Sequence, residues 1–418
     1  MDTSLTYYRR DNDNLPVMGY GSSSIMYSLW CMSPNINMDW AKQYWLPGQE
    51  HVQQDAGLSG GKNNPYFTAY EQLNTLDRDR AYGNTALNLH LYKGLDLMIR
   101  GGMDFSRDLR TSRHPKSSYS YKYGMYNETE LTSLQLSGDF LLKYDRKLGA
   151  GFNLTANLGG SIINRSFVQT IMTAEQLKQP GIYSLANSVN RIKTDNYSYE
   201  RQTNSIYGLV SLSWRDAVYL DITGRNDWSS TLNKNNRSFF YPSVAFSALI
   251  TEAVKLPKAV SFWKVRASWA KVGFDQSTVY MLQDTYSFNT YWDGNAAFTP
   301  PTTIIDPNIK PYFTSSFEVG TDLRFFGSRL RFDFSYYRTY DEGQIQKVDI
   351  NQSSGYEEML TNGNDYRREG YELMVGATPI KTKDWKWDIS FNWFQTRKYL
   401  DKIYNGAYNY NNLSLIHI

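Results

Sequence analysis

Apolar and polar residues alternate with a period of two along many segments of the chain. The clearest segment is 385–393, in which Trp387 and Phe391 share one face, and Asp388 and Asn392 share the other. In a helix, the same residues would mix apolar and polar side chains on one face. The pattern therefore predicts β-strands with one apolar and one polar face. It recurs in three further segments: 152–158, 264–269 and 330–337.

The predicted strands form pairs that are joined by short polar turns. We expect about twelve strands: 87–92 with 95–104, 134–144 with 152–162, 206–214 with 218–225, 240–250 with 265–272, 317–324 with 330–337, and 371–378 with 385–393. Longer polar stretches separate the pairs: 105–130, 163–198, 275–312 and 341–365. Short turns at one end and long loops at the other are typical of a transmembrane antiparallel β-barrel with periplasmic turns and extracellular loops. A β-sandwich would have shorter strands.

The two ends of the chain depart from this pattern. Residues 1–81 are rich in Tyr, Trp, Asn, Gly and Pro and show little alternation, so we expect one large extracellular loop whose preceding strand lies upstream. The partial barrel is then expected over residues 82–412. Residues 413–418 match a peptide that a common sequencing adapter encodes, so we interpret them as adapter-derived; a natural strand start is the alternative. The first residues lack a signal peptide, so we expect that the natural N-terminus is missing.

Composition supports a membrane barrel over a helical membrane protein. Mean hydropathy is −0.56, and no run approaches the roughly 18 apolar residues of a transmembrane helix. Barrel strands stay compatible with this value because only alternate residues face lipid. The 34 Tyr and 11 Trp suit the aromatic girdles that barrels place at both membrane interfaces.

Charge and candidate chemistry exclude several function classes. A net charge of +3 argues against a nucleic-acid partner. Cys31 is the single cysteine, and the four histidines lack metal-ligand spacing, so we expect no metal and no cofactor. No Ser/His/Asp set or phosphate-binding glycine loop appears in the sequence. We therefore expect a protein that is not an enzyme.

A set of motifs in fixed order resembles one family. The sequence Gly-Arg-Asn-Asp-Trp-Ser-Ser-Thr-Leu at 224–232 is followed by an aromatic-Pro-Ser strand at 240–244. Further matches lie at 64–66, 79–80, 265–268, 272–273, 316–320, 353–356, 370–372 and 377–379. Together they resemble the SusC/RagA family of TonB-dependent receptors over nearly the whole chain. One departure is Arg368-Glu369-Gly370, where the family usually has Asn-Lys-Gly at a loop-to-strand junction.

The resemblance implies more than this chain contains. It implies a 22-stranded barrel, a plug domain and a TonB box, in the outer membrane of a Gram-negative, Bacteroidota-like bacterium. It also implies a SusD-like surface lipoprotein that covers the barrel and a TonB complex that couples import to the proton gradient. The chain is expected to cover about half of that barrel and to lack the plug, the TonB box and the closing strands. We expect that it cannot insert alone, since unpaired strand edges are not tolerated in lipid.

Charged residues on the polar faces are candidates for lining the barrel lumen. Within one predicted hairpin, Asp322, Arg324 and Asp333 lie close enough to form a network, and Lys386 and Asp388 lie on the last predicted strand. Ion pairs within the barrel wall, without any role in binding, are the alternative interpretation.

Aromatic residues in the long loops are candidates for substrate contact. The candidates are Trp30, Trp40, Trp45, Tyr66, Tyr291, Trp292 and Asp293. Sugar rings stack on flat aromatic side chains, and their hydroxyls bind carboxylates, so oligosaccharides are the preferred ligand. Peptides would use the same surface. The alternative is that these aromatics pack the loops together or contact the lipoprotein.

Two other function classes remain open at this point. A passive porin or a siderophore-type receptor would share the barrel, and a porin would have neither plug nor lipoprotein. A surface adhesin or binding protein would not need a lipid-facing surface.

Overall fold

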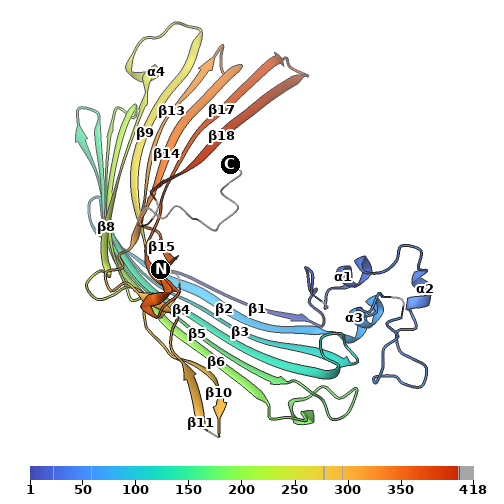
Figure 1. Cartoon of the computed structure of the whole chain (residues 1–418). Helices are drawn as coiled ribbons and strands as arrows, with labels where there is room; N and C mark the ends of the chain where they lie inside the picture. Colours follow the sequence, from blue (N-terminus) through green and yellow to red (C-terminus); the bar gives the residue numbers. More distant parts are fainter. Residues whose placement is uncertain (22, 58, 276–277, 294, 403, 405–418) are drawn as a thin grey trace.

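One long antiparallel sheet dominates the structure, a computed structural model that describes residues 1–21, 23–57, 59–275, 278–293, 295–402 and 404. Thirteen strands are hydrogen-bonded in chain order, from β1 (Asp2–Asn12) to β18 (Lys386–Lys402). The sheet bends into an open arc with β1 and β18 at its two edges (Figure 1). The expected class, a partial antiparallel β-barrel, is confirmed.

All twelve predicted strands are present in this sheet. They are β2 (Asn74–Tyr92), β3 (Leu95–Lys116), β4 (Tyr123–Gly149), β5 (Phe152–Ala174), β6 (Lys193–Trp214), β7 (Val218–Ser229), β8 (Ser238–Leu249), β9 (Val260–Phe274), β13 (Tyr312–Phe325), β14 (Leu330–Glu342), β17 (Asp365–Lys381) and β18.

Several strands are much longer than the alternation predicts. β4 has 27 residues, and β3 and β6 have 22 each, whereas a strand needs about 9–11 residues to cross the membrane. Most of the expected loop 105–130 and half of the expected loop 163–198 are therefore strand. The reason is physical: above the bilayer both faces of a strand meet water, so backbone pairing continues while the apolar half of the pattern is lost.

The interpretation of residues 1–81 as a loop is wrong at both ends. β1 pairs with β2 from Asp2 opposite Ala86 to Asn12 opposite Leu76, and β2 itself begins at Asn74. The expected upstream strand is therefore at least partly present as β1. Its sequence gave little signal because polar residues occupy both faces and few apolar residues alternate with them.

The connections keep the expected asymmetry between the two ends of the sheet. The turn from β2 to β3 needs only Lys93 and Gly94, and Gly94 has a φ of +74°. In the turn from β6 to β7, Arg215 and Asp216 both have a φ of +53°, the backbone twist that tight hairpins favour. The opposite connections are longer and include residues 13–73 and 275–311.

Small elements fill the long connections. Between β1 and β2 lie α1 (Ile25–Trp30), α2 (Met38–Ala41) and α3 (Pro65–Glu71), which gather at one end of β1–β3 (Figure 1). β10 (Ser287–Trp292) and β11 (Asn295–Thr299) form a separate hairpin. β12 (Thr303–Ile305), β15 (Ile345–Asp349) and β16 (Glu358–Asn362) form a three-stranded sheet. The remaining elements are η1 (Leu185–Asn187), α4 (Ile250–Ala253) and η2 (Gln352–Ser354).

The buried apolar residues of the described chain lie largely in these connections and at strand ends. Trp45, Phe67, Leu177, Ile309 and Leu360 are among the most buried side chains. None of the described helices has the length and apolar character needed to span a membrane. Residues 413–418, interpreted above as adapter-derived, lie outside the described residues.

Candidate functional site: the polar face of the sheet

The alternation sorts side chains onto two faces that run continuously across the sheet. Opposite residues in an antiparallel pair point to the same side, and Val375 lies opposite Phe391 while Met374 lies opposite Asn392. Tracing the pairs across all strands puts one set of positions on an apolar face and the other set on a polar face. We use these two names below.

Within the part of the chain that the structure describes, the apolar face has no protein layer over it. Phe391 and Trp387 are 58% and 54% exposed, which a soluble core would not allow. A continuous exposed apolar surface that extends over many strands marks contact with an apolar partner. In a barrel that partner is lipid.

The five predicted lumen-lining residues all lie on the polar face, where ion pairs involve each of them. Arg324 Nη2 lies 2.7 Å from Asp322 Oδ2, and Lys386 Nζ lies 2.6 Å from Asp388 Oδ2. Asp333 pairs with Arg266 of β9 at 2.9 Å, across β13, and not with Arg324. These contacts fit the alternative interpretation of ion pairs within the wall.

The loop candidates fall in two separate places. Trp30 and Trp40 are 72% and 63% exposed on α1 and α2, whereas Trp45 is 6% exposed and lies 5.1 Å from the Phe67 ring. Tyr66, on α3, has its ring 6.1 Å from that of Tyr70.

The second group lies in the β10–β11 hairpin. Tyr291 and Trp292 are the last residues of β10, and Asp293 is exposed in the turn. This hairpin projects away from α1–α3 (Figure 1). The structure does not bring the two groups of loop candidates together.

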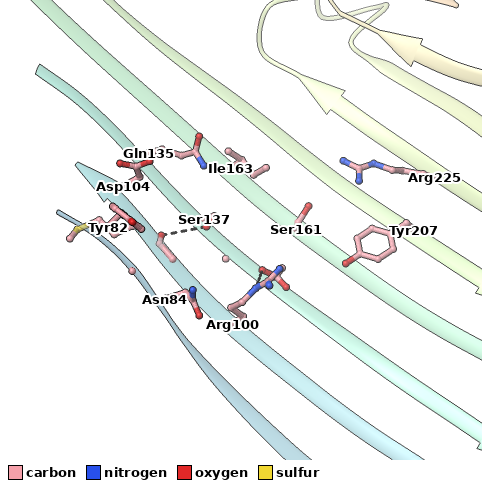
Figure 2. A pocket seen from close by; sticks show the side chains of 15 residues that line it. Tyr82, Asn84, Arg100, Asp104, Gln135, Ser137, Ser161, Ile163, Tyr207 and Arg225 are labelled. Atoms are coloured by element: carbon pink, nitrogen blue, oxygen red, sulfur yellow. Dashed lines mark hydrogen bonds and ion pairs between the residues drawn. The ribbon is translucent and has the colours of Figure 1, made fainter. Parts of the chain in front are cut away.

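A hollow on the polar face was not predicted from the sequence. It has a volume of about 480 Å³ and draws its lining from β2 to β7. Figure 2 shows the polar side chains that surround it, among them Arg100, Ser137, Ser161, Tyr207 and Arg225. The signal available in the sequence was the set of polar residues at alternate positions of six consecutive strands, which becomes a site only when the register is known.

The charges around this hollow neutralise one another. Arg100 Nε lies 2.9 Å from Asp139, and Arg225 Nε lies 2.7 Å from Asp227. Arg80 binds Asp104 through two hydrogen bonds of 2.8 and 2.5 Å. Charge-assisted pairs of this kind hold their side chains in fixed positions, so the hollow is polar without a net excess of one charge.

The motif at 224–232 ties strand ends together. Asp227 accepts a hydrogen bond from the Tyr241 hydroxyl at 2.7 Å, in addition to the one from Arg225. Beyond it, the hydroxyls of Ser229 and Thr231 both donate to Asp275 at the end of β9. The residues that carry the resemblance therefore fix the geometry of the β6–β9 region.

The antiparallel sheet, with its apolar and polar faces, defines the class of protein. The chain forms part of a bacterial outer-membrane β-barrel. Residues 33–415 match the family described as TonB dependent receptor-like, beta-barrel. The chain belongs to that family, whose barrels are outer-membrane proteins, and its resemblance to SusC/RagA receptors is confirmed by the relatives below.

Curated relatives are similar over much of this chain. TonB-dependent receptor P3 of Formosa agariphila is 22% identical over 347 residues, which are 82% of this chain and 33% of the relative. TonB-dependent receptor SusC of Bacteroides thetaiotaomicron is 24% identical over 220 residues, which are 50% of this chain and 22% of SusC. The chain thus spans about a third of the length of the first relative and less than a quarter of the length of SusC.

Solved structures of the RagAB peptide transporter share the fold. One superposes with a TM-score of 0.74 at 20% identity, covering 83% of this chain and 39% of that chain. The structure of the RagAB importer in its closed-closed state superposes with a TM-score of 0.76, covering 84% of this chain and 40% of that chain. At this identity the likeness concerns the fold alone.

Proposed function

We propose that this chain is the barrel part of an energised nutrient importer of the SusC/RagA type. The observation that carries the proposal is the separation of an apolar from a polar face across the sheet from β2 to β18, in a chain whose residues 33–415 match the TonB-dependent receptor barrel. In such a barrel the apolar face meets lipid and the polar face lines the lumen. The protein is a transporter and not an enzyme.

The partners follow from the same assignment. A SusD-like lipoprotein would cover the extracellular side, near the exposed aromatics of α1 and α2, and the TonB complex would supply energy through the remainder of the receptor. The similarity to SusC and to RagAB supports this arrangement. The open edges at β1 and β18 require further strands, since unpaired backbone groups cannot stay in hydrocarbon.

Oligosaccharides are the cargo that we prefer, with peptides as the alternative. Trp30 and Trp40 present exposed rings that can stack on sugars, and Asp293 offers a carboxylate for hydroxyl groups. RagAB is described as a peptide transporter, and the same aromatic surface would also accept apolar peptide side chains.

Energy-dependent uptake tests the proposal. Cells that carry the full-length receptor should take up a labelled oligosaccharide only with TonB and an intact proton gradient, and the tagged receptor should co-purify with a lipoprotein. Uptake that continues after an uncoupler is added contradicts the proposal and favours a passive porin. Assembly without any uptake of oligosaccharide or peptide favours a surface binding protein.

A further inference from the structure

The Tyr207 ring lies flat on the polar face of the sheet, over a glycine of the neighbouring strand. A Cβ atom added at Gly159 would lie 2.5 Å from Cε2 and Cζ of Tyr207 and 2.7 Å from its hydroxyl oxygen. Any larger residue at position 159 would therefore push the ring off the sheet. Figure 2 shows the ring face-on among the side chains that line the hollow.

Hydrogen-bonding groups of fixed position surround this ring. Arg100 is held by Asp139, and Arg225 is held by Asp227 and by the Ser205 hydroxyl at 2.9 Å. The Arg225 guanidinium lies 5.7 Å from the centre of the Tyr207 ring. Among the described residues, the Tyr207 hydroxyl makes no hydrogen bond, so it stays available to a ligand.

We propose that this hollow binds a sugar unit of a neutral oligosaccharide, with Tyr207 as the stacking surface. The inference rests on the proposed function and adds to it a binding site within the barrel wall. A flat ring suits the apolar face of a pyranose, and pre-positioned guanidinium and carboxylate groups suit its hydroxyls. Because the charged groups already pair with one another, a ligand with a net charge would find no unpaired counter-charge.

The size and shape of the hollow agree with such a ligand. Its volume of about 480 Å³ lies in the range of roughly 300–1,000 Å³ that is common for small-molecule sites. Gly102, opposite Ser137 on the polar face, is among the lining residues and adds no side chain to the hollow. The floor is thus formed partly by backbone, and the walls by Arg100, Asp104 and Gln135.

A second ring of the wall provides a matched control. Tyr337 lies over Gly370 in the same way, but its hydroxyl is hydrogen-bonded to Thr396 at 2.6 Å. Because Tyr337 packs on Gly370 as Tyr207 packs on Gly159, substitutions in this pair also remove or displace a ring of the wall. The control therefore separates loss of a binding surface from loss of wall packing.

The test uses the full-length transporter with its plug, purified in detergent and probed with an array of neutral oligosaccharides. Calorimetry with the best-retained oligosaccharide follows for Tyr207→Ala, Tyr207→Leu, Tyr207→Phe and Gly159→Ala. We expect a loss of roughly tenfold or more in affinity for Tyr207→Ala, Tyr207→Leu and Gly159→Ala, the size of one aromatic contact. Tyr207→Phe keeps the flat face and should stay within about threefold of wild type. Tyr337→Ala and Gly370→Ala should bind as wild type.

The outcomes separate this proposal from the proposed function. Unchanged affinity of Tyr207→Ala and Tyr207→Leu, or an equal loss in the Tyr337→Ala control, overturns the wall site, while energy-dependent oligosaccharide uptake would leave the import function standing. A wild-type receptor that binds no neutral oligosaccharide overturns the wall site as well. If that receptor imports peptides, the preference for oligosaccharides also fails.

Discussion

The Nη2 atom of Arg201 lies 2.7 Å from each carboxylate oxygen of Asp275, which joins β6 to the residue that follows β9. Both side chains are mostly buried, at 21% and 15% exposure. Asp275 also accepts hydrogen bonds from Ser229 and Thr231, so a single carboxylate links the ends of three strands. This link gives Ser229 and Thr231, both in the motif at 224–232, a structural role.

Substituting Asp275→Asn should loosen the extracellular end of β6–β9. The change leaves the Arg201 charge without its partner, and hydrogen bonds to charged groups contribute about 1.5–3 kcal/mol each. Limited proteolysis of the full-length receptor should then cut the segment 275–311 faster than in wild type.

The control for this variant is Asp11→Asn, which breaks the ion pair between Arg9 and Asp11. Both side chains of that pair are more than half exposed, and such pairs contribute little to stability. We expect wild-type proteolysis for Asp11→Asn. Equal rates of proteolysis for Asp275→Asn and Asp11→Asn would show that the hydrogen bonds to Asp275 do not stabilise this end of the sheet.

Gly320→Ala should weaken the barrel wall, because Arg266 lies over Gly320 on its way to Asp333. An added Cβ would lie 2.8 Å from Nε and Cζ of the Arg266 guanidinium. Overpacking typically costs about 1–3 kcal/mol, so the folded barrel should unfold at a lower temperature in a gel-shift assay. Gly101→Ala is the control, since nothing lies within 4 Å of the added atom; equal shifts would argue against the packing role of Gly320.

His114 should make the extracellular region less stable at acidic pH. It lies 20 residues into β3, well beyond the about 9–11 residues that cross the bilayer. Burial lowers the pKa of His114 from 6.5 to about 4, and its Nδ1 atom has no hydrogen-bond partner among the described residues. Between these two values the unfolded state binds a proton that the folded state rejects, so stability falls as the pH drops from about 6.5 to about 4.

Denaturant unfolding at about pH 7.5 and about pH 5 measures this effect. His114→Phe removes the ionisable group and keeps a ring beside Tyr121, whose ring centre is 4.7 Å away in the native protein. We expect the variant to lose less stability than wild type on acidification. An identical pH dependence in both proteins would mean that His114 does not control it.

The sequence predicts the membrane part of this fold better than the rest. Trp387 and Phe391 alternate with polar residues because lipid meets one side of the strand, so that both the strand and its faces could be inferred. Beyond the bilayer both sides of a strand meet water, so apolar and polar residues do not alternate. For this reason β1 and the extracellular halves of β3 to β6 were missed. The hollow depends on side chains from six strands. The placement of Tyr207 over Gly159 follows from register, and no local pattern encodes it.

A pair of adjacent substitutions tests the central claim, that the apolar face meets lipid and the polar face meets a wet lumen. Phe391 and Asn392 are neighbours on β18 and point to opposite faces. An arginine on the lipid side near the bilayer centre costs about 2–4 kcal/mol, whereas the lumen tolerates it. The measurement is the fraction of full-length receptor that assembles in the outer membrane as a heat-modifiable barrel. We expect Phe391→Arg to lower that fraction and Asn392→Arg to match wild type; equal effects of the two substitutions would contradict the assignment of the faces.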